Sequence, residues 1–268
     1  GQLRRIRDAV AAARLVMDRT QHTFLVGESA SQFATEMGLP ETDLSSPASQ
    51  EQHASWVASQ CQPNFWVSGG LIPDPAEACG PYQPTAGARE ARGGERAPNA
   101  TTTESARLHR QSKQRRVRRN WAGRGNHDTI ATVVVGVDGA VASATSTNGA
   151  AHKVHGRVGD SPIAGAGSYA RAPDGGCGGT GDGDVMMRFL PCYQAVESMS
   201  RGMSPREAAL DAIARISKHF PTFGGAIVVV NGRGEHSGAC SRGLGLTWSY
   251  SYRDGTMDRH AVATVECV

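Results

Sequence analysis

Apolar side chains in the first part of the chain recur with the spacing of amphipathic helices. In residues 3–17, LRRIRDAVAAARLVM, one helical face collects Leu3, Ile6, Val10, Ala13 and Val16. Residues 22–27, HTFLVG, are predicted to form a short buried strand. A second helix is predicted through SASQFATEM, closed by Gly38. A third is predicted to open at Ser46, with a proline at its first helical position.

The second half of the chain contains two hairpin patterns. TIATVVVGVDGAVASATSTNG predicts two strands around Asp138-Gly139, and GGAIVVVNGRGEHSGAC predicts two more around Asn231-Gly232. Both turns place a glycine where a positive φ is expected.

A glycine-rich stretch and two helices separate these hairpins. GGCGGTGDGD, residues 175–184, is interpreted as a loop, and a helix is predicted near 184–201. A further helix is predicted over Pro205–His219, opened by a capping box of Ser204 and Glu207. The pattern as a whole predicts an α+β fold in which antiparallel sheets are layered against helices.

Composition allows a sizeable core but distributes charge unevenly. The 268 residues are 39% apolar, and the net charge is +3. Residues 86–127 hold eleven Arg or Lys against three Glu, whereas the rest of the chain has 17 basic and 22 acidic residues. We therefore predict a basic flexible linker over 86–126 and neither a nucleic-acid-binding fold nor a nucleic-acid partner. No apolar run reaches the roughly 18 residues of a membrane span, so no membrane association is predicted.

Six cysteines and one sequon bear on the cellular route. No Cys-x-x-Cys pair occurs, so a zinc site is not predicted. The spacing allows two short-loop disulfides, Cys61–Cys79 and Cys240–Cys267. Asn99 opens an Asn-Ala-Thr glycosylation sequon, which is a weak signal. Together these features favour a secretory or lysosomal route.

Three sites could carry chemistry, and each has a plainer alternative. Thr129 begins a strand after an Asp, so cleavage of the Asp128–Thr129 bond would give one residue both a hydroxyl nucleophile and an α-amine base. Arg157 and Asp160 could clamp the two ends of an amino-acid head group. Thr180 and Gly181 could supply an oxyanion hole from a hydroxyl and an amide. For each site taken alone, the plainer interpretation is favoured: a strand start, a surface ion pair and a turn.

Other site types find less support. Asp182 and Asp184 invite a calcium interpretation, but a full calcium loop is absent. Neither a phosphate-binding Gly-Lys-Ser/Thr sequence nor the Gly-x-Ser-x-Gly of a serine hydrolase occurs.

Taken together, the motifs resemble the glycosylasparaginase family of N-terminal-nucleophile hydrolases. They are HDTI, TSTNG, HGRVGDSPIAGAG, TGDGD and MRFLPCYQAVE, in that order, with HTFLVGESASQFA, CQPNFW and CGPY upstream. The resemblance covers nearly the whole chain except the basic linker.

The resemblance implies a fold and a division of the chain. The expected fold is a four-layer αββα sandwich forming a single domain over residues 1–268. Self-cleavage would divide it into an α portion, 1–128, and a β portion, 129–268. The family's αβ pairs typically assemble further, so an αβ heterodimer pairing into a heterotetramer is expected.

The resemblance also implies roles for individual residues. Thr129 would be the nucleophile, and Thr147 would contact it and its amine. His127 and Asp128 would flank the scissile bond. Arg157 and Asp160 would hold the substrate's α-carboxylate and α-amine. Thr180 and Gly181 would form the oxyanion hole.

The implied reaction is hydrolysis of the side-chain amide that joins asparagine to N-acetylglucosamine. It would pass through a β-aspartyl ester and use a free glycoasparagine as substrate, with no metal or organic cofactor. The runner-up is an asparaginase or isoaspartyl peptidase of the same superfamily. A third hypothesis is an inactive, uncleaved relative.

The sequence also departs from the family pattern. Family members have a further stretch before the first helix, so we expect this chain alone to expose a sheet edge and to be poorly active. Ala131 stands where a glycine is common, and its methyl group is expected to crowd the scissile turn. Cys177 and Cys192 have no evident family partner, so Cys177 is expected to be a buried, inert thiol.

Overall fold

The computed structural model describes residues 1–85 and 128–268, so the predicted linker, His127 and Asn99 lie outside the described residues. The described chain forms two compact units. The first comprises 1–42, 128–150 and 156–268, and the second comprises 43–85 and 151–155. The expectation of a single domain stays a prediction.

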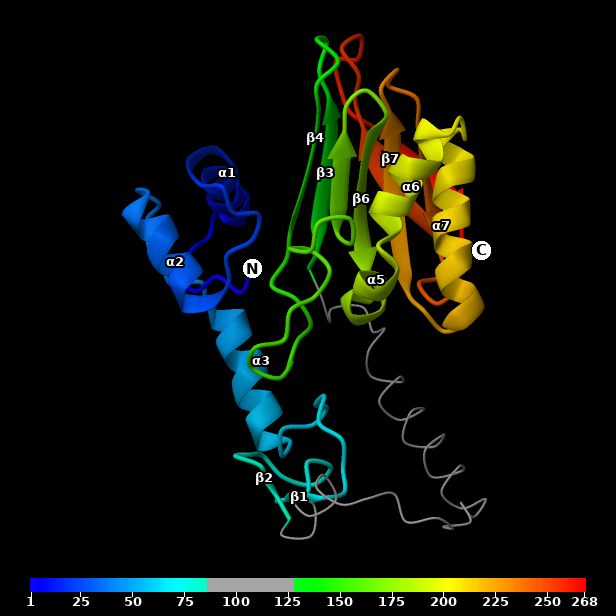
Figure 1. The fold of residues 1–268 in the computed structure, drawn as a ribbon. Helices are drawn as coiled ribbons and strands as arrows, with labels where there is room; N and C mark the ends of the chain where they lie inside the picture. Colours follow the sequence, from blue (N-terminus) through cyan, green and yellow to red (C-terminus); the bar gives the residue numbers. More distant parts are fainter. Residues whose placement is uncertain (86–127) are drawn as a thin grey trace, which may run out of the picture. The chain divides into compact units, whose positions relative to one another are not determined.

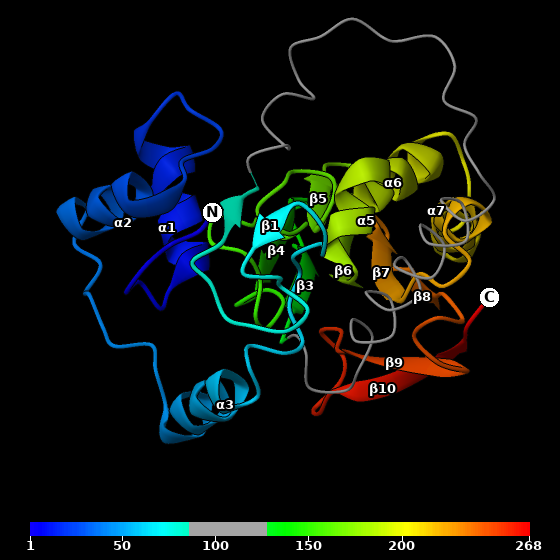
Figure 2. The same ribbon diagram turned by 90° about the horizontal axis from the view of Figure 1, so that it is seen from below.

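A four-stranded antiparallel sheet organises the first unit. Its order is β5 (Ser168–Arg171), β6 (Gly175–Gly181), β7 (Gly225–Asn231) and β8 (His236–Cys240). Two further antiparallel hairpins are β3 (Ile130–Val135) with β4 (Val141–Ser146), and β9 (Thr247–Tyr252) with β10 (Ala261–Glu266). Both hairpins lie on one face of the sheet, and helices cover the other (Figures 1 and 2). The α+β class is therefore confirmed.

The helical face holds the main core. The helices are α5 (Gly183–Phe189), α6 (Pro191–Ser200) and α7 (Pro205–His219). Fully buried side chains from these helices and the sheet pack together, including Met186, Val196, Ile213, Ile216, Ile227 and Val229. The prediction for α7 is confirmed, including its capping box.

The single helix expected near 184–201 is wrong, because α5 and α6 are separate helices. Leu190 between them adopts a left-handed conformation with φ 50°. Pro191, which follows it, cannot donate a backbone hydrogen bond and begins the new helix.

The glycine-rich loop expected over 175–184 is also wrong, because most of it is the buried strand β6. A Cβ on Gly176 would lie 2.5 Å from Val133, and one on Gly178 would lie 2.8 Å from Ala131. On the opposite face, a Cβ on Gly179 would lie 2.6 Å from Met186. The glycines therefore allow a hairpin and a helix to approach the strand closely from its two sides.

Both predicted hairpins are confirmed, but their turns differ. Gly139 has φ 81°, as expected for the first turn. In the second, the positive φ is found at Gly234 rather than at Gly232. Gly232 is required for another reason, since a Cβ there would lie 2.0 Å from the Pro173 carbonyl oxygen.

The hairpin of β9 and β10 was not predicted. The sequence pattern of a strand was present, because aromatic and polar residues alternate in β9. In the structure these positions alternate between half-buried and exposed. Trp248, Tyr250 and Tyr252 occupy the half-buried positions, and the indole and the Tyr250 ring contact Gly238 of β8.

The first helix begins later than predicted. It is α1 (Ala9–Arg19), because Arg5 has φ 62° and Ile6 forms a β-bridge with Glu41. Its buried face carries Ala12 and Val16, whereas Val10 of the predicted face is exposed.

The strand expected at 22–27 is absent from this described part of the chain. Phe24 and Val26 are exposed, and the Leu25 carbonyl and the Gly27 amide hydrogen-bond to Gly1 rather than to a neighbouring strand. The helix that follows is confirmed as α2 (Gly27–Glu36), with Gly38 just beyond it at φ 93°.

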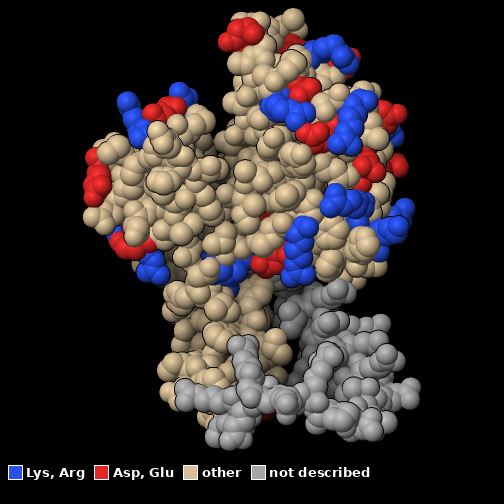
Figure 3. All heavy atoms as spheres, viewed as in Figure 1, with Lys and Arg blue, Asp and Glu red and all other residues tan. Residues whose placement is uncertain are grey.

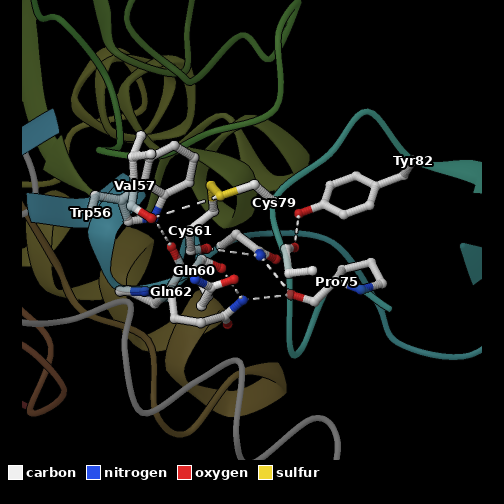
Figure 4. The surroundings of a disulfide bond; sticks show 11 residues. Trp56, Val57, Gln60, Cys61, Gln62, Pro75, Cys79 and Tyr82 are labelled. Carbon is white, nitrogen blue, oxygen red and sulfur yellow. Dashed lines mark hydrogen bonds between the residues drawn. A yellow bond between two sulfur atoms is a disulfide. The ribbon is translucent and has the colours of Figure 1, made fainter. Parts of the chain in front are cut away.

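The second unit is built on α3 (Pro47–Ala58), whose predicted Ser46 cap is confirmed. A short pair, β1 (Leu71–Ile72) and β2 (Gln83–Pro84), follows. Figure 4 shows the predicted Cys61–Cys79 disulfide beside the Gln62 amide, which donates to the Pro75 carbonyl at 2.7 Å.

Two more disulfides lie in the first unit. Cys240–Cys267 is confirmed. The expectation of an unpaired thiol at Cys177 is wrong, because Cys177 of β6 is bonded to Cys192 in the first turn of α6. Their Cα atoms lie 5.1 Å apart, since α6 packs directly on β6.

On the face drawn in Figure 3, positive and negative side chains are interspersed over the region of α6 and α7. Glu197 of α6, for example, pairs with Arg171 and Arg201. Within the described ranges, no helix has the length and apolar character needed to cross a membrane.

Candidate active site

The hairpin of β3 and β4 places two threonines opposite each other. The register pairs Ile130 with Ser146, so Thr129 and Thr147 are the next facing positions beyond the strand ends. The Thr129 hydroxyl donates to Thr147 Oγ1 at 3.1 Å. The turn at Asp138-Gly139 sets this register and therefore the contact.

Asp128 is held by the same cluster. Its Oδ1 accepts from the Thr147 hydroxyl at 3.2 Å and from the Asn148 amide at 2.9 Å. The Gly149 amide donates to Thr147 Oγ1 at 2.9 Å. Thr147 therefore fixes the side chains on both sides of the Asp128–Thr129 peptide bond.

Strand β6 brings Thr180 to the same end of the hairpin. Gly176 faces Val133 and Gly178 faces Ala131, so β6 and β3 run past each other with their inward positions matched. Because side chains alternate with a period of two, Thr180 and Thr129 are the next matched positions. Gly181 follows at φ 139°, where a Cβ would lie 2.4 Å from the Gly224 carbonyl oxygen.

The methyl group of Ala131 lies against Gly178 on β6. It therefore points into the packing between β3 and β6, two residues beyond the Asp128–Thr129 bond. Because Gly178 has no side chain, the position accepts an alanine.

Arg157 is already paired. Its Nε and Nη2 donate to the two carboxylate oxygens of Asp184 at 3.2 and 3.1 Å, a bidentate arrangement. The Arg157 side chain is only 15% exposed. The contact was not predicted from the sequence, although an arginine in one glycine-rich loop and an aspartate in the next were the available signal.

Asp160 is almost completely buried. A Cβ on Gly183 would lie 2.6 Å from its Oδ1, so only a glycine there leaves room. Among the described residues no hydrogen-bond partner exists for Asp160 Oδ2. Burial raises the pKa of Asp160 to about 6, although nearby Arg157 opposes this shift.

The loop bearing Asp160 is tied to the hairpin. The Thr145 hydroxyl of β4 donates to the Ser161 carbonyl at 2.9 Å. Asp182, at the start of α5, is also largely buried, and burial raises its pKa to about 6. Within the described ranges, His, Cys, Asp and Glu side chains form no group of three suited to a metal ion.

The described residues of the predicted site are thus gathered at one end of the first unit, and His127 lies outside the described residues. Asp128, Thr129 and Thr147 are joined by hydrogen bonds, and Thr180 lies on the facing strand. Asn148 and Asp184 are the partners that sequence reasoning missed.

The family model described as Asparaginase matches residues 1–260. The chain belongs to this asparaginase family. A relative from Arabidopsis thaliana, named "Probable isoaspartyl peptidase/L-asparaginase 3", is 47% identical over 264 residues, 98% of this chain and 69% of the relative. The N(4)-(beta-N-acetylglucosaminyl)-L-asparaginase of Rattus norvegicus is 42% identical over 242 residues, 90% of this asparaginase-family chain and 63% of the rat protein.

A Drosophila melanogaster relative is 42% identical over 267 residues. That match takes in 99% of this chain but only 62% of the fly protein. The chain therefore spans less than the full length of the relatives that it matches.

Proposed function

We propose that this protein is an N-terminal-nucleophile amidohydrolase that cleaves the side-chain amide of glycoasparagines. Membership of the asparaginase family supports amide hydrolysis in general. The proposal of a threonine nucleophile released by self-cleavage rests on the hydrogen-bonded set of Asp128, Thr129 and Thr147.

Maturation begins with the Thr129 hydroxyl attacking the carbonyl carbon of Asp128. The peptide nitrogen leaves and takes up a proton, so the amide becomes an ester between Asp128 and Thr129. The α-amine of Thr129 is freed in this step. Water then hydrolyses the ester, which frees the Thr129 hydroxyl and leaves Asp128 with a carboxyl group. Thr147 supports this step because it holds the Thr129 hydroxyl and the Asp128 side chain together.

Turnover uses the freed amine as the base. With an ordinary pKa near ~7.7, an α-amine can accept the hydroxyl proton near neutral pH. Thr129 Oγ1 then attacks the substrate amide, and Thr180 and Gly181 stabilise the oxyanion. The protonated amine gives its proton to the departing amino sugar. Water finally cleaves the β-aspartyl ester and releases aspartate.

Substrate selection rests on the buried pair of charges. Arg157 would bind the α-carboxylate and Asp160 the α-ammonium of a free amino acid. Asp160 Oδ2 has no hydrogen-bond partner in the part of the chain that the structure describes. This supports the assignment, because a buried carboxylate oxygen gains most from a cationic donor.

Cleavage of unglycosylated β-aspartyl amides is the second candidate. The 47% identity to the Arabidopsis relative, which is named as an isoaspartyl peptidase and asparaginase, favours it specifically. Both reactions use the same nucleophile and the same clamp. Parallel assays on glycoasparagine and on an isoaspartyl dipeptide distinguish the two substrates.

The remaining features of the proposal follow from the resemblance. They are a four-layer αββα sandwich, an αβ heterodimer that pairs into a heterotetramer, and a lysosomal or secretory location. Three disulfides support an oxidising route.

Changing Thr129 tests the proposed chemistry. Thr129→Ala is expected to leave one uncut chain and to abolish hydrolysis, because no hydroxyl remains to attack either amide. Thr129→Ser should still be cut. Intact mass and N-terminal sequencing of the full-length protein measure both outcomes.

The matched control is Thr132→Ala, on the exposed face of β3, which should be cut and active like the wild type. A new N-terminus at residue 129 in the Thr129→Ala protein would rule out self-cleavage by this residue. Wild-type protein that stays uncut and inactive would favour the inactive-relative hypothesis.

A further inference from the structure

The proposed reaction does not explain the ion pair between Arg157 and Asp184. Among the ion pairs of the described residues, Arg157 has the most buried arginine side chain, 15% exposed against 38% or more for the others. The two hydrogen bonds that it donates to described residues both go to the Asp184 carboxylate. Such a bidentate pair fixes the orientation of the guanidinium plane.

Asp184 is placed to act on the clamp from helix α5, which follows the strand that carries the proposed oxyanion-hole residues. It is the second residue of α5, and its neighbour Gly183 packs against Asp160. The guanidinium of Arg157 folds back over the intervening loop, since a Cβ on Gly159 would lie 2.9 Å from Arg157 Nη1. Asp184 therefore holds the arginine from one side while Gly183 leaves room for Asp160.

Without Asp184, the buried carboxylates that interact with Arg157 would be Asp160 and Asp182. Asp182 already accepts from the Val185 amide as the cap of α5, which leaves Asp160 as the available partner. Arg157 and Asp160 already interact electrostatically, and Asp160 Oδ2 has no hydrogen-bond partner among the described residues. A partly buried arginine that loses its partner gains most by pairing with that oxygen. An internal Arg157–Asp160 pair would leave neither group free for a ligand.

We propose that Asp184 is a positioning residue that holds Arg157 away from Asp160, so that the two bind opposite ends of the substrate's amino-acid head group. This inference rests on the proposed function, because it assigns the clamp its ligand. Asp184 itself need not touch the substrate.

The test compares two β-aspartyl anilides that differ only at the α-carboxyl group. One has a free carboxylate and the other a neutral carboxamide. Asp184→Asn is expected to lower kcat/KM for the free acid by roughly tenfold or more, mainly through KM, because the carboxylate contact is lost. The carboxamide substrate should change by no more than about twofold.

Controls separate positioning from general damage. Asp184→Glu keeps the charge and should recover most of the preference for the free carboxylate. Asp174→Asn removes one of the two carboxylate partners of Arg171, at the turn between β5 and β6, and should leave that preference unchanged. Asp184→Ser is made in parallel as a smaller neutral variant, with self-cleavage and circular dichroism reporting folding. An equal loss on both anilides, or no loss on either, would overturn the proposal.

Binding of L-aspartate, measured by calorimetry, distinguishes the two possible failures. If wild-type protein hydrolyses neither anilide, the proposed function fails. Weaker aspartate binding by a folded neutral variant would still support the role of Asp184. Identical dissociation constants for wild type and variant would reject it.

Discussion

At the residue scale, the candidate site holds two largely buried carboxylates, Asp160 and Asp182. Burial raises the pKa values of Asp160 and Asp182 to about 6, well above the ordinary value of 3.8. An unfolded chain would ionise these groups near pH 4. Keeping these buried groups charged at neutral pH therefore lowers the free energy of unfolding. We infer that they are retained because they bind a ligand and not because they stabilise the fold.

This cost predicts a pH-dependent effect of Asp160→Asn on stability. Between about pH 4 and pH 6, folded Asp160 retains its proton whereas the unfolded chain has released it. The free energy of unfolding of the wild type therefore falls as pH rises through that window. Asp160→Asn should be more stable than wild type at pH 8, by up to about 3 kcal/mol. The advantage should shrink as pH falls towards 4.

Urea unfolding at pH 4, 6 and 8 measures the difference, with both proteins carrying Thr129→Ala so that each is one chain. Asp258→Asn, at an exposed position, is the control and should show no such trend. A variant advantage that grows as pH falls would contradict the assignment of a raised pKa.

At the element scale, the glycines of β6 organise the first unit. A run of glycines ordinarily indicates a loop, and local pattern alone offered no other interpretation. The run is ordered because Val133 and Ala131 pack on one side of it and Met186 on the other. The same close packing aligns β6 with β3, so that Thr180 and Thr129 are the next matched positions along the two strands.

Adding one methyl group should disturb this alignment. Gly178→Ala would place a Cβ 2.8 Å from that of Ala131. We expect a loss of stability of about 1–3 kcal/mol, as for other overpacked cores. The double variant Gly178→Ala with Ala131→Gly should recover most of it, because only one methyl group then occupies the gap.

Thermal unfolding of the four proteins in this cycle measures the coupling. Gly255→Ala is the matched control, since a Cβ there meets nothing within 4 Å. Simple additivity of the two substitutions would show that the methyl groups do not compete.

At the scale of the whole molecule, the disulfides are divided between the two compact units. Cys61–Cys79 closes the second unit, which has little buried apolar surface of its own; α3 buries none of its residues. Cys177–Cys192 and Cys240–Cys267 lie in the first unit, beside an extensive core. We therefore expect the second unit to depend more strongly on its disulfide.

Removing that bond should loosen one unit selectively. A disulfide closing a loop of 18 residues stabilises by roughly 3 kcal/mol. In Cys61→Ala with Cys79→Ala, amide exchange should accelerate within 43–85 and stay slow in β6 and β7. Hydrogen-exchange mass spectrometry measures both regions, and equal acceleration in both would show that the units unfold together.

The sequence by itself determined the features that depend on neighbours along the chain. The capping boxes of α3 and α7, the Asp138-Gly139 turn and the motif that carries Thr129 need only local chemistry. The motifs also indicated the family, which is confirmed, and the residues proposed here as the nucleophile and the clamp.

Only the tertiary structure decided what those residues contact. In the structure the glycine-rich segment is a strand, Cys177 is bonded to Cys192, and Arg157 pairs with Asp184. Each of these depends on segments distant in sequence coming within a few ångströms. Local periodicity carries no information on such distances, because it describes which face a side chain takes and not what lies opposite it.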